Sequence, residues 1–174
     1  MTLPIPWQTQ LETDQLWMDQ ALDLAIKAGQ RGEIPIGALI VDQSGKCIAA
    51  SGNTKEQTHN ATAHAEIVVL RSASQVLKEP YLTQCTLYVT LEPCPMCAGA
   101  ILQARVGRLV YGTADPKAGA INTVLNLPAS EAAFHSLQVT AGIRETSCRN
   151  LLQHWFADLR QSSSLKSPAQ LKQY

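Results

Sequence analysis

Hydrophobic positions along this chain change between helical and strand spacing. From Asp14 to Gly29 apolar residues recur every three or four positions, which predicts an amphipathic helix capped by Asp14. Two short apolar runs follow, over 36–41 and 47–50, and the Asp42–Gly45 segment between them has turn-forming residues. This pattern predicts a β-hairpin.

The same reading predicts elements along the rest of the chain. These are a helix over 62–80, a strand over 86–91, a helix beginning at Pro93 and Pro95, strands over 108–112 and 137–140, and a helix whose apolar stripe runs over 148–159. The roughly 25 residues between the last two strands could hold a crossover helix, so these strands can be parallel. Helices and strands alternate without a repeat or linker, which predicts one α/β domain over 12–161 and a flexible tail over 162–174.

Composition agrees with a soluble globular protein. Of the 174 residues, 45% are hydrophobic and 16% are charged. No apolar run reaches the roughly 18–20 residues that a membrane span needs, and the first residues lack the pattern of a secretory signal. We therefore expect a cytoplasmic protein without a membrane partner.

Charge and cysteine content add two expectations. The formal net charge is +0, but residues 141–174 hold five bases against two acids. Such a basic end could meet phosphates or could simply be a solvated helix face. The five cysteines are an odd number, which disfavours a disulfide framework. Cys47, Cys85 and Cys148 have apolar surroundings in the sequence and are expected in the core.

Cys94 and Cys97 are different, because a Cys-x-x-Cys pair at the first turn of a helix can direct both sulfurs at one metal ion. The helix N-terminus would stabilise the thiolates. His64, at the start of another predicted helix, offers a third ligand. A structural zinc site usually has four ligands, so three ligands predict a catalytic zinc with one position open for water.

Glu66 stands two residues after His64 and would project in another direction on a helix. A carboxylate there can accept a proton from water and pass it to a ring nitrogen and then to a leaving amine. His-x-Glu followed by Pro-Cys-x-x-Cys is the arrangement typical of zinc deaminases. Two other interpretations remain: a redox cysteine pair, and a zinc-stabilised binding module without catalysis.

With these motifs the chain resembles the bacterial tRNA adenosine deaminase family, within the cytidine deaminase-like superfamily. The resemblance runs from about Trp17 to Leu159, and the stretch from Asp115 through Lys117 to Gly119 and Ala120 narrows it to the tRNA enzymes. It implies a homodimer of three-layer α/β/α subunits, each with a five-stranded mixed sheet and one zinc ion. It also implies conversion of the wobble adenosine (position 34) of a tRNA anticodon stem-loop to inosine, with Glu66 moving the protons.

The resemblance also implies substrate contacts. Asn53 would touch the target nucleotide, and Asp115 and Lys117 would line the anticodon groove. Arg149 and Phe156 could help to hold the loop, although core packing is the simpler interpretation of Phe156. Arg105 and Arg108 would touch phosphates or be solvated. The runner-up function is deamination of a free base or nucleoside, such as guanine or cytosine, on the same fold.

Overall fold

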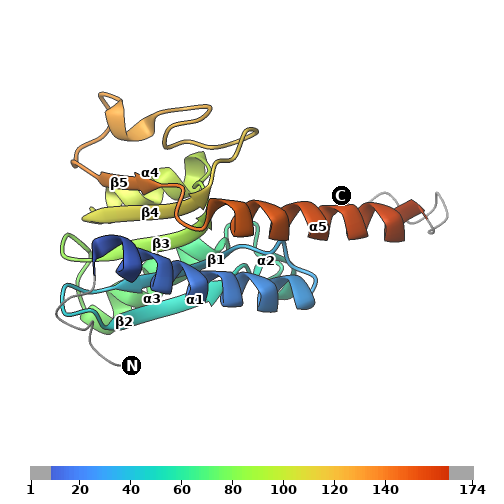
Figure 1. Ribbon diagram of the computed structural model, residues 1–174. Coiled ribbons are helices and arrows are strands. Elements are labelled where there is room, and N and C mark those ends of the chain that lie inside the picture. The colour runs from blue at the N-terminus through green and yellow to red at the C-terminus, as the bar shows by residue number, and fades with distance from the viewer. Residues whose placement is uncertain (1–8, 165–174) are drawn as a thin grey trace.

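The computed structural model describes residues 9–164, and the side chains of 9–161. Five strands form one mixed sheet in the order β2-β1-β3-β4-β5 (Figure 1). The strands are β1 (Gly37–Val41), β2 (Cys47–Gly52), β3 (Thr86–Leu91), β4 (Arg108–Thr113) and β5 (Gln138–Ala141). Strand β1 is antiparallel to both β2 and β3, whereas β3, β4 and β5 are parallel. The predicted hairpin and the predicted parallel pair are both confirmed.

Helices cover both faces of the sheet. The helices are α1 (Gln10–Gln30), α2 (Lys55–Thr58), α3 (Ala65–Leu77), α4 (Pro95–Gln103) and α5 (Glu145–Ser164), with a short 3-10 helix, η1 (Leu127–Ala129). Helices α1 and α5 lie on one face and α3 and α4 on the other (Figure 1). The three-layer α/β/α expectation is therefore confirmed. No helix among residues 9–164 is long and apolar enough to cross a bilayer.

Strand β1 shows why both faces need a cover. Its side chains alternate in direction, as in any strand. Ala38 and Ile40 join the larger core cluster, beneath α3 and α4, while Leu39 and Val41 join the smaller one, beneath α1. A continuous apolar strand of this kind is stable only when it is buried on both sides.

Helix α1 begins earlier than its apolar stripe predicts. Thr9 is the N-cap, and it forms a capping box in which Glu12 accepts a hydrogen bond from the Thr9 backbone N–H at 2.7 Å. The expected cap, Asp14, is instead buried inside the molecule. It accepts hydrogen bonds from Tyr88 at 2.8 Å and from both terminal nitrogens of Arg108. The capping assignment was wrong because Asp14 faces the sheet, where a cationic partner compensates its charge.

The connection from β4 to β5 holds no crossover helix. Its one helical turn within the described residues is η1, and the remainder is irregular chain. Pro116, Gly119 and Pro128 interrupt the segment. Several of its backbone N–H groups donate to the buried carboxylate of Glu92. At the other end, α5 continues to Ser164, so residues 162–164 are helical where a tail was expected. The rest of that predicted tail lies outside the described residues.

Two of the three remaining cysteines are buried as expected: Cys85 is 4% exposed and Cys148 is 1% exposed. Cys47 is half-buried and packs against the smaller core cluster. The expectation of a core position is therefore confirmed for Cys85 and Cys148, and Cys47 lies at the edge of the core.

Candidate active site and metal centre

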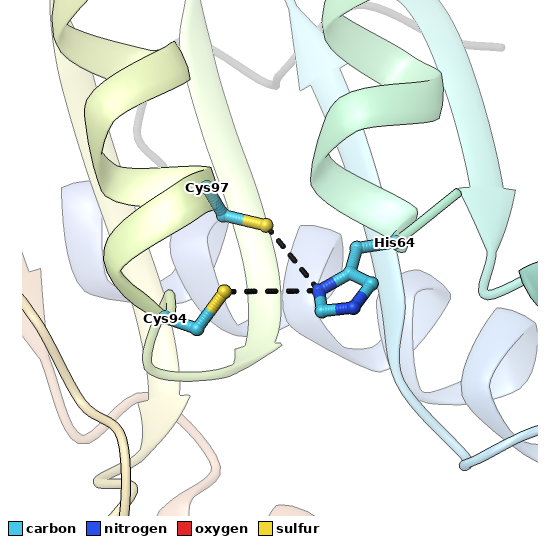
Figure 2. A group of neighbouring side chains, drawn as sticks. All are labelled: His64, Cys94 and Cys97. Atoms are coloured by element: carbon cyan, nitrogen blue, oxygen red, sulfur yellow. Dashed lines mark hydrogen bonds between the residues drawn. The ribbon is translucent and has the colours of Figure 1, made fainter. Parts of the chain in front are cut away.

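The three predicted metal ligands meet where α3 and α4 begin. His64 is the N-cap residue of α3, Cys94 is the N-cap of α4, and Cys97 lies in the first turn of α4. Figure 2 shows the imidazole of His64 turned toward both sulfurs. His64 Nδ1 lies 3.8 Å from Cys94 Sγ and 3.5 Å from Cys97 Sγ. All three candidate ligand atoms are within 4.8 Å of one another.

These separations fit a zinc ion. Typical bonds of about 2.0–2.1 Å to nitrogen and 2.3 Å to sulfur, at tetrahedral angles, separate the two ligand atoms by about 3.6 Å. The observed nitrogen–sulfur distances of 3.8 Å and 3.5 Å lie on either side of that value. One imidazole and two thiols also form a donor set that zinc favours.

The local electrostatics favour the thiolate that a metal needs. A hydrogen bond from Cys97, aided by one from His64, lowers the pKa of Cys94 to about 4. The pKa of Cys97 is raised in turn, first by its bond to Cys94 and then by burial. Both cysteines also lie at the positive end of α4, where a helix stabilises negative charge. The pair therefore favours a thiolate at this end of α4.

Glu66, the second residue of α3, is 4% exposed. Its Oε2 atom has no hydrogen-bond partner within residues 9–161. Burial raises the pKa of this carboxyl above its usual value, although the nearby His64 opposes that effect. A buried carboxylate oxygen without a partner is costly, by about 1–3 kcal/mol, and such atoms are typical of functional sites. Glu66 thus offers a free proton acceptor beside the ligand cluster.

A cavity of about 780 Å³ opens over this cluster. Its lining includes His64, Glu66, Glu92 and Cys94. It also includes the end of β4 and the segment that follows, from Thr113 to Ala118, and one face of α5. The α5 residues in the lining are Arg149, Leu152, Gln153, Phe156 and Arg160.

Most of the residues expected to contact substrate lie in this cavity wall. Asp115, Lys117, Arg149 and Phe156 all line it. Phe156 is 39% exposed, so the simpler expectation of core packing was wrong. Its neighbour Trp155 turns toward the body of the protein and packs against Gly29. A Cβ atom added at Gly29 would lie 3.3 Å from the indole.

Asn53 and Asp115 make bonds that their expected roles did not include. Asn53 is 3% exposed and lies outside the cavity lining, where its Oδ1 accepts a hydrogen bond from the Ala65 N–H at 2.8 Å. It thereby supports the start of α3, next to His64. Asp115 Oδ1 accepts from the backbone N–H groups of Lys117 and Ala118, which folds the segment into a turn.

Two arginines expected at phosphates have other surroundings. Arg108 is tied to buried Asp14, with 2.6 Å between Nη2 and Oδ2, and its Nη2 also donates to Thr140. A phosphate role for Arg108 was therefore wrong. Arg105 is placed over the ring of Tyr81, 4.5 Å from its centroid.

The sequence interpretation missed Gln153, Arg160 and the role of Glu92. Arg149, Gln153, Phe156 and Arg160 follow one another at intervals of three or four residues, which places them on one helical face. That spacing is visible in the sequence, but the apolar stripe of the same helix predicts packing for Phe156. Nothing in the local sequence identifies the partners of Glu92, because they lie 23–31 residues away.

Comparison with known proteins agrees with the site. The family model described as MafB19-like deaminase matches residues 12–160. A tRNA-specific adenosine deaminase of Bacillus subtilis is 43% identical over 147 residues, which are 84% of this chain and 91% of that protein. The chain also matches, at 43% identity, a tRNA(Ile)-lysidine synthase of Deinococcus radiodurans, but it spans only 25% of that longer protein.

Solved structures of deaminases also resemble this chain. A structure from a study of A-to-I editing by tRNA:A34 deaminases is 43% identical, with a TM-score of 0.76 over 79% of this chain and 99% of that chain. A guanine deaminase from Bacillus subtilis is 38% identical but matches over 57% of this chain and 64% of that chain, with a TM-score of 0.56. The chain belongs to the MafB19-like deaminase family and, within it, groups with the tRNA-specific adenosine deaminases.

Proposed function

We propose that this protein hydrolyses the wobble adenosine of a tRNA anticodon to inosine, with release of ammonia. The observation that carries the proposal is the free Oε2 atom of buried Glu66 beside the His64, Cys94 and Cys97 cluster, in a cavity rimmed by cationic side chains. The reaction consumes one water, breaks the bond from C6 to the exocyclic nitrogen and forms a bond from C6 to oxygen.

His64, Cys94 and Cys97 would hold one zinc ion. A zinc ion bound there would act as a Lewis acid that makes water reactive near neutral pH. Glu66 then has two tasks. It accepts the proton of the attacking water, and it returns protons to the ring nitrogen and to the departing amine. Its raised pKa suits both tasks, because the group must be able to bind and release a proton.

Cavity size and charge favour an RNA loop over a free base. A single base occupies only part of 780 Å³, whereas a splayed nucleotide with its neighbours needs more room. Lys117, Arg149 and Arg160 line the same cavity, and such cations bind phosphates. The alternative is deamination of a free base such as guanine, and the partial likeness to a guanine deaminase is what supports it.

The remaining contacts follow from this arrangement. Phe156 would stack on a base, and Lys117 and Arg149 would bind the backbone beside it. Asn53 Oδ1 is engaged by Ala65, so its Nδ2 would be the group that contacts the target nucleotide. Asp115 would shape this wall through its turn. We place the reaction in the cytoplasm and expect a homodimer, which a mass measurement at working concentration tests.

The deciding experiment compares two substrate sets side by side. One is an anticodon stem-loop with adenosine at the wobble position, and the other is a panel of free bases and nucleosides. Inosine in the stem-loop and no ammonia from the panel is the expected result. Activity on the panel alone would retain zinc and Glu66 but overturn the RNA substrate.

A further inference from the structure

Glu92 directly follows β3 and is 1% exposed, yet it is not part of the ligand set or the proton path. Its Oε1 atom accepts three backbone hydrogen bonds, from Ile121 at 3.1 Å, Asn122 at 2.7 Å and Thr123 at 3.0 Å. Its Oε2 atom accepts from the Asp115 N–H at 3.2 Å and from the Thr123 hydroxyl. One buried carboxylate thus binds both ends of the 115–123 segment.

The segment closes tightly around this side chain. A Cβ atom added at Gly119 would lie 2.4 Å from Glu92 Oε2 and 2.7 Å from the Asp115 carbonyl oxygen. Only glycine fits at such a distance without displacing the carboxylate. A further bond, from the Ala120 N–H to the Pro93 carbonyl at 2.9 Å, ties the same segment to the chain just before α4.

Glu92 therefore joins two parts of the site. Two residues after it, Cys94 begins the helix that supplies both sulfur ligands. The segment that it binds carries the cavity-lining residues Asp115 to Ala118. The segment has no regular secondary structure to hold it at this place, and carboxylate bonds to backbone N–H groups are strong and directional.

We propose that Glu92 is a positioning residue that fixes the 115–118 wall of the cavity relative to the metal centre, and that it thereby determines how tightly the anticodon loop binds. This inference rests on the proposed function for its substrate. It assigns Glu92 to substrate binding, and not to proton transfer or metal retention.

The main test is Glu92→Gln in the full chain. One amide oxygen can replace Oε1, but the NH2 group then meets the Asp115 N–H, so donor faces donor. We expect KM for the stem-loop to rise about tenfold, as for the loss of one charge-assisted hydrogen bond. We expect kcat to stay within about threefold. Zinc content should stay at one per chain.

Thr123 provides a second, milder variant in case Glu92→Gln folds poorly. Thr123→Val removes the hydroxyl bond to Oε2 and keeps the backbone N–H bond to Oε1, so KM should rise by a smaller factor. Thr123→Ser keeps both the hydroxyl bond and the backbone bond to Glu92, so its KM should equal that of the wild type. Asp42→Asn is the matched control, because Asp42 also accepts backbone N–H bonds, from Ser44 and Lys46, but in the β1–β2 turn away from the cavity. Its kinetics should match those of the wild type.

Hydrogen exchange separates this proposal from the proposed function, because it needs no substrate. Glu92→Gln should speed exchange of the amides of 115–123 and leave those of 97–103 unchanged. If the wild type made no inosine in the stem-loop, the function would fail while exchange still tested the role of Glu92. A fall in kcat and zinc content at constant KM, or unchanged exchange over 115–123, would overturn the positioning role.

Discussion

The two sides of the cavity are built in different ways. On one side, the ligands and Glu66 lie within the first turn of α3 or α4, and Glu66 and Cys97 are almost fully buried. On the other side, Lys117, Arg149 and Phe156 are exposed, and the 114–118 wall has no regular structure. The proposed chemistry thus rests on residues placed by short-range helix geometry, whereas the proposed recognition wall depends on contacts between distant parts of the chain.

This difference explains why a family of such sites can keep one reaction while it changes substrate. The candidate metal ligands take their directions from the N-termini of α3 and α4. The opposite wall can change shape, as long as something anchors it. Metal retention, folding and binding should therefore respond to different substitutions.

The largest effect is expected for Cys94→Ala. Removing one of the three candidate ligands should abolish stoichiometric zinc binding and lower deaminase activity below detection. Metal analysis and inosine assays on the same preparation check both results, with Cys85→Ala as a control that leaves zinc in place. Full activity and one zinc per chain in Cys94→Ala would contradict the ligand assignment.

Arg108→Gln should act on stability and not on binding. It leaves the buried Asp14 carboxylate without its cation, which should cost about 3 kcal/mol of unfolding free energy and lower Tm by about 6–12 °C. Arg144→Gln breaks an exposed pair with Asp19 and should change stability by less than about 1 kcal/mol. A changed salt dependence of KM in Arg108→Gln would instead show that Arg108 contacts the RNA.

The same pair predicts a pH dependence. Burial alone would raise the pKa of Asp14, but bonds from Arg108, Tyr88 and Gln10 outweigh it, so the pKa lies below its usual value. Its stabilising contribution is therefore present above about pH 4 and is lost as pH falls further through the lowered pKa. Urea unfolding of the wild type between pH 3 and 6 should show this loss, and Arg108→Gln should show a weaker one.

Smaller effects are expected for single cations of the cavity wall. Arg149→Gln, Arg160→Gln or Lys117→Gln should each raise KM for the stem-loop about tenfold or less, and lower the slope of log KM against log salt by about 0.7–1. Arg149 already pairs with exposed Glu145, but such a pair is weak and can yield to a phosphate. Lys46→Gln, in the β1–β2 turn, is the control. An unchanged salt slope in all three variants would place the RNA elsewhere.

Spacing in the sequence identifies the proposed chemical side of the site, whereas the residues of the proposed recognition side follow only from the family resemblance. His64, Glu66, Cys94 and Cys97 were identifiable because each occupies a fixed place within one helical turn, so that spacing alone sets its direction. The strand over 86–91 was also predicted with its observed bounds, since an uninterrupted apolar run has few alternatives.

Two of the misses share one physical cause, which is pairing across long stretches of chain. Asp14 was assigned to a cap because its partner Arg108 is 94 residues away. The 114–137 connection is long enough to hold a helix, and the five acceptor bonds of Glu92 that bind part of it cannot be recognised from local spacing. Phe156 was assigned to the core because its apolar stripe looks the same whether it packs or lines a cavity.

The comparison of the two sides is tested most directly by Glu66→Gln, with stem-loop binding and single-turnover inosine formation measured together. We predict that this variant keeps its zinc and binds the stem-loop within about threefold of the wild type, while inosine forms about 10²- to 10⁴-fold more slowly. Inosine formation at the wild-type rate would contradict the role of Glu66. A loss of binding equal to the loss of rate would contradict the separation of chemistry from recognition.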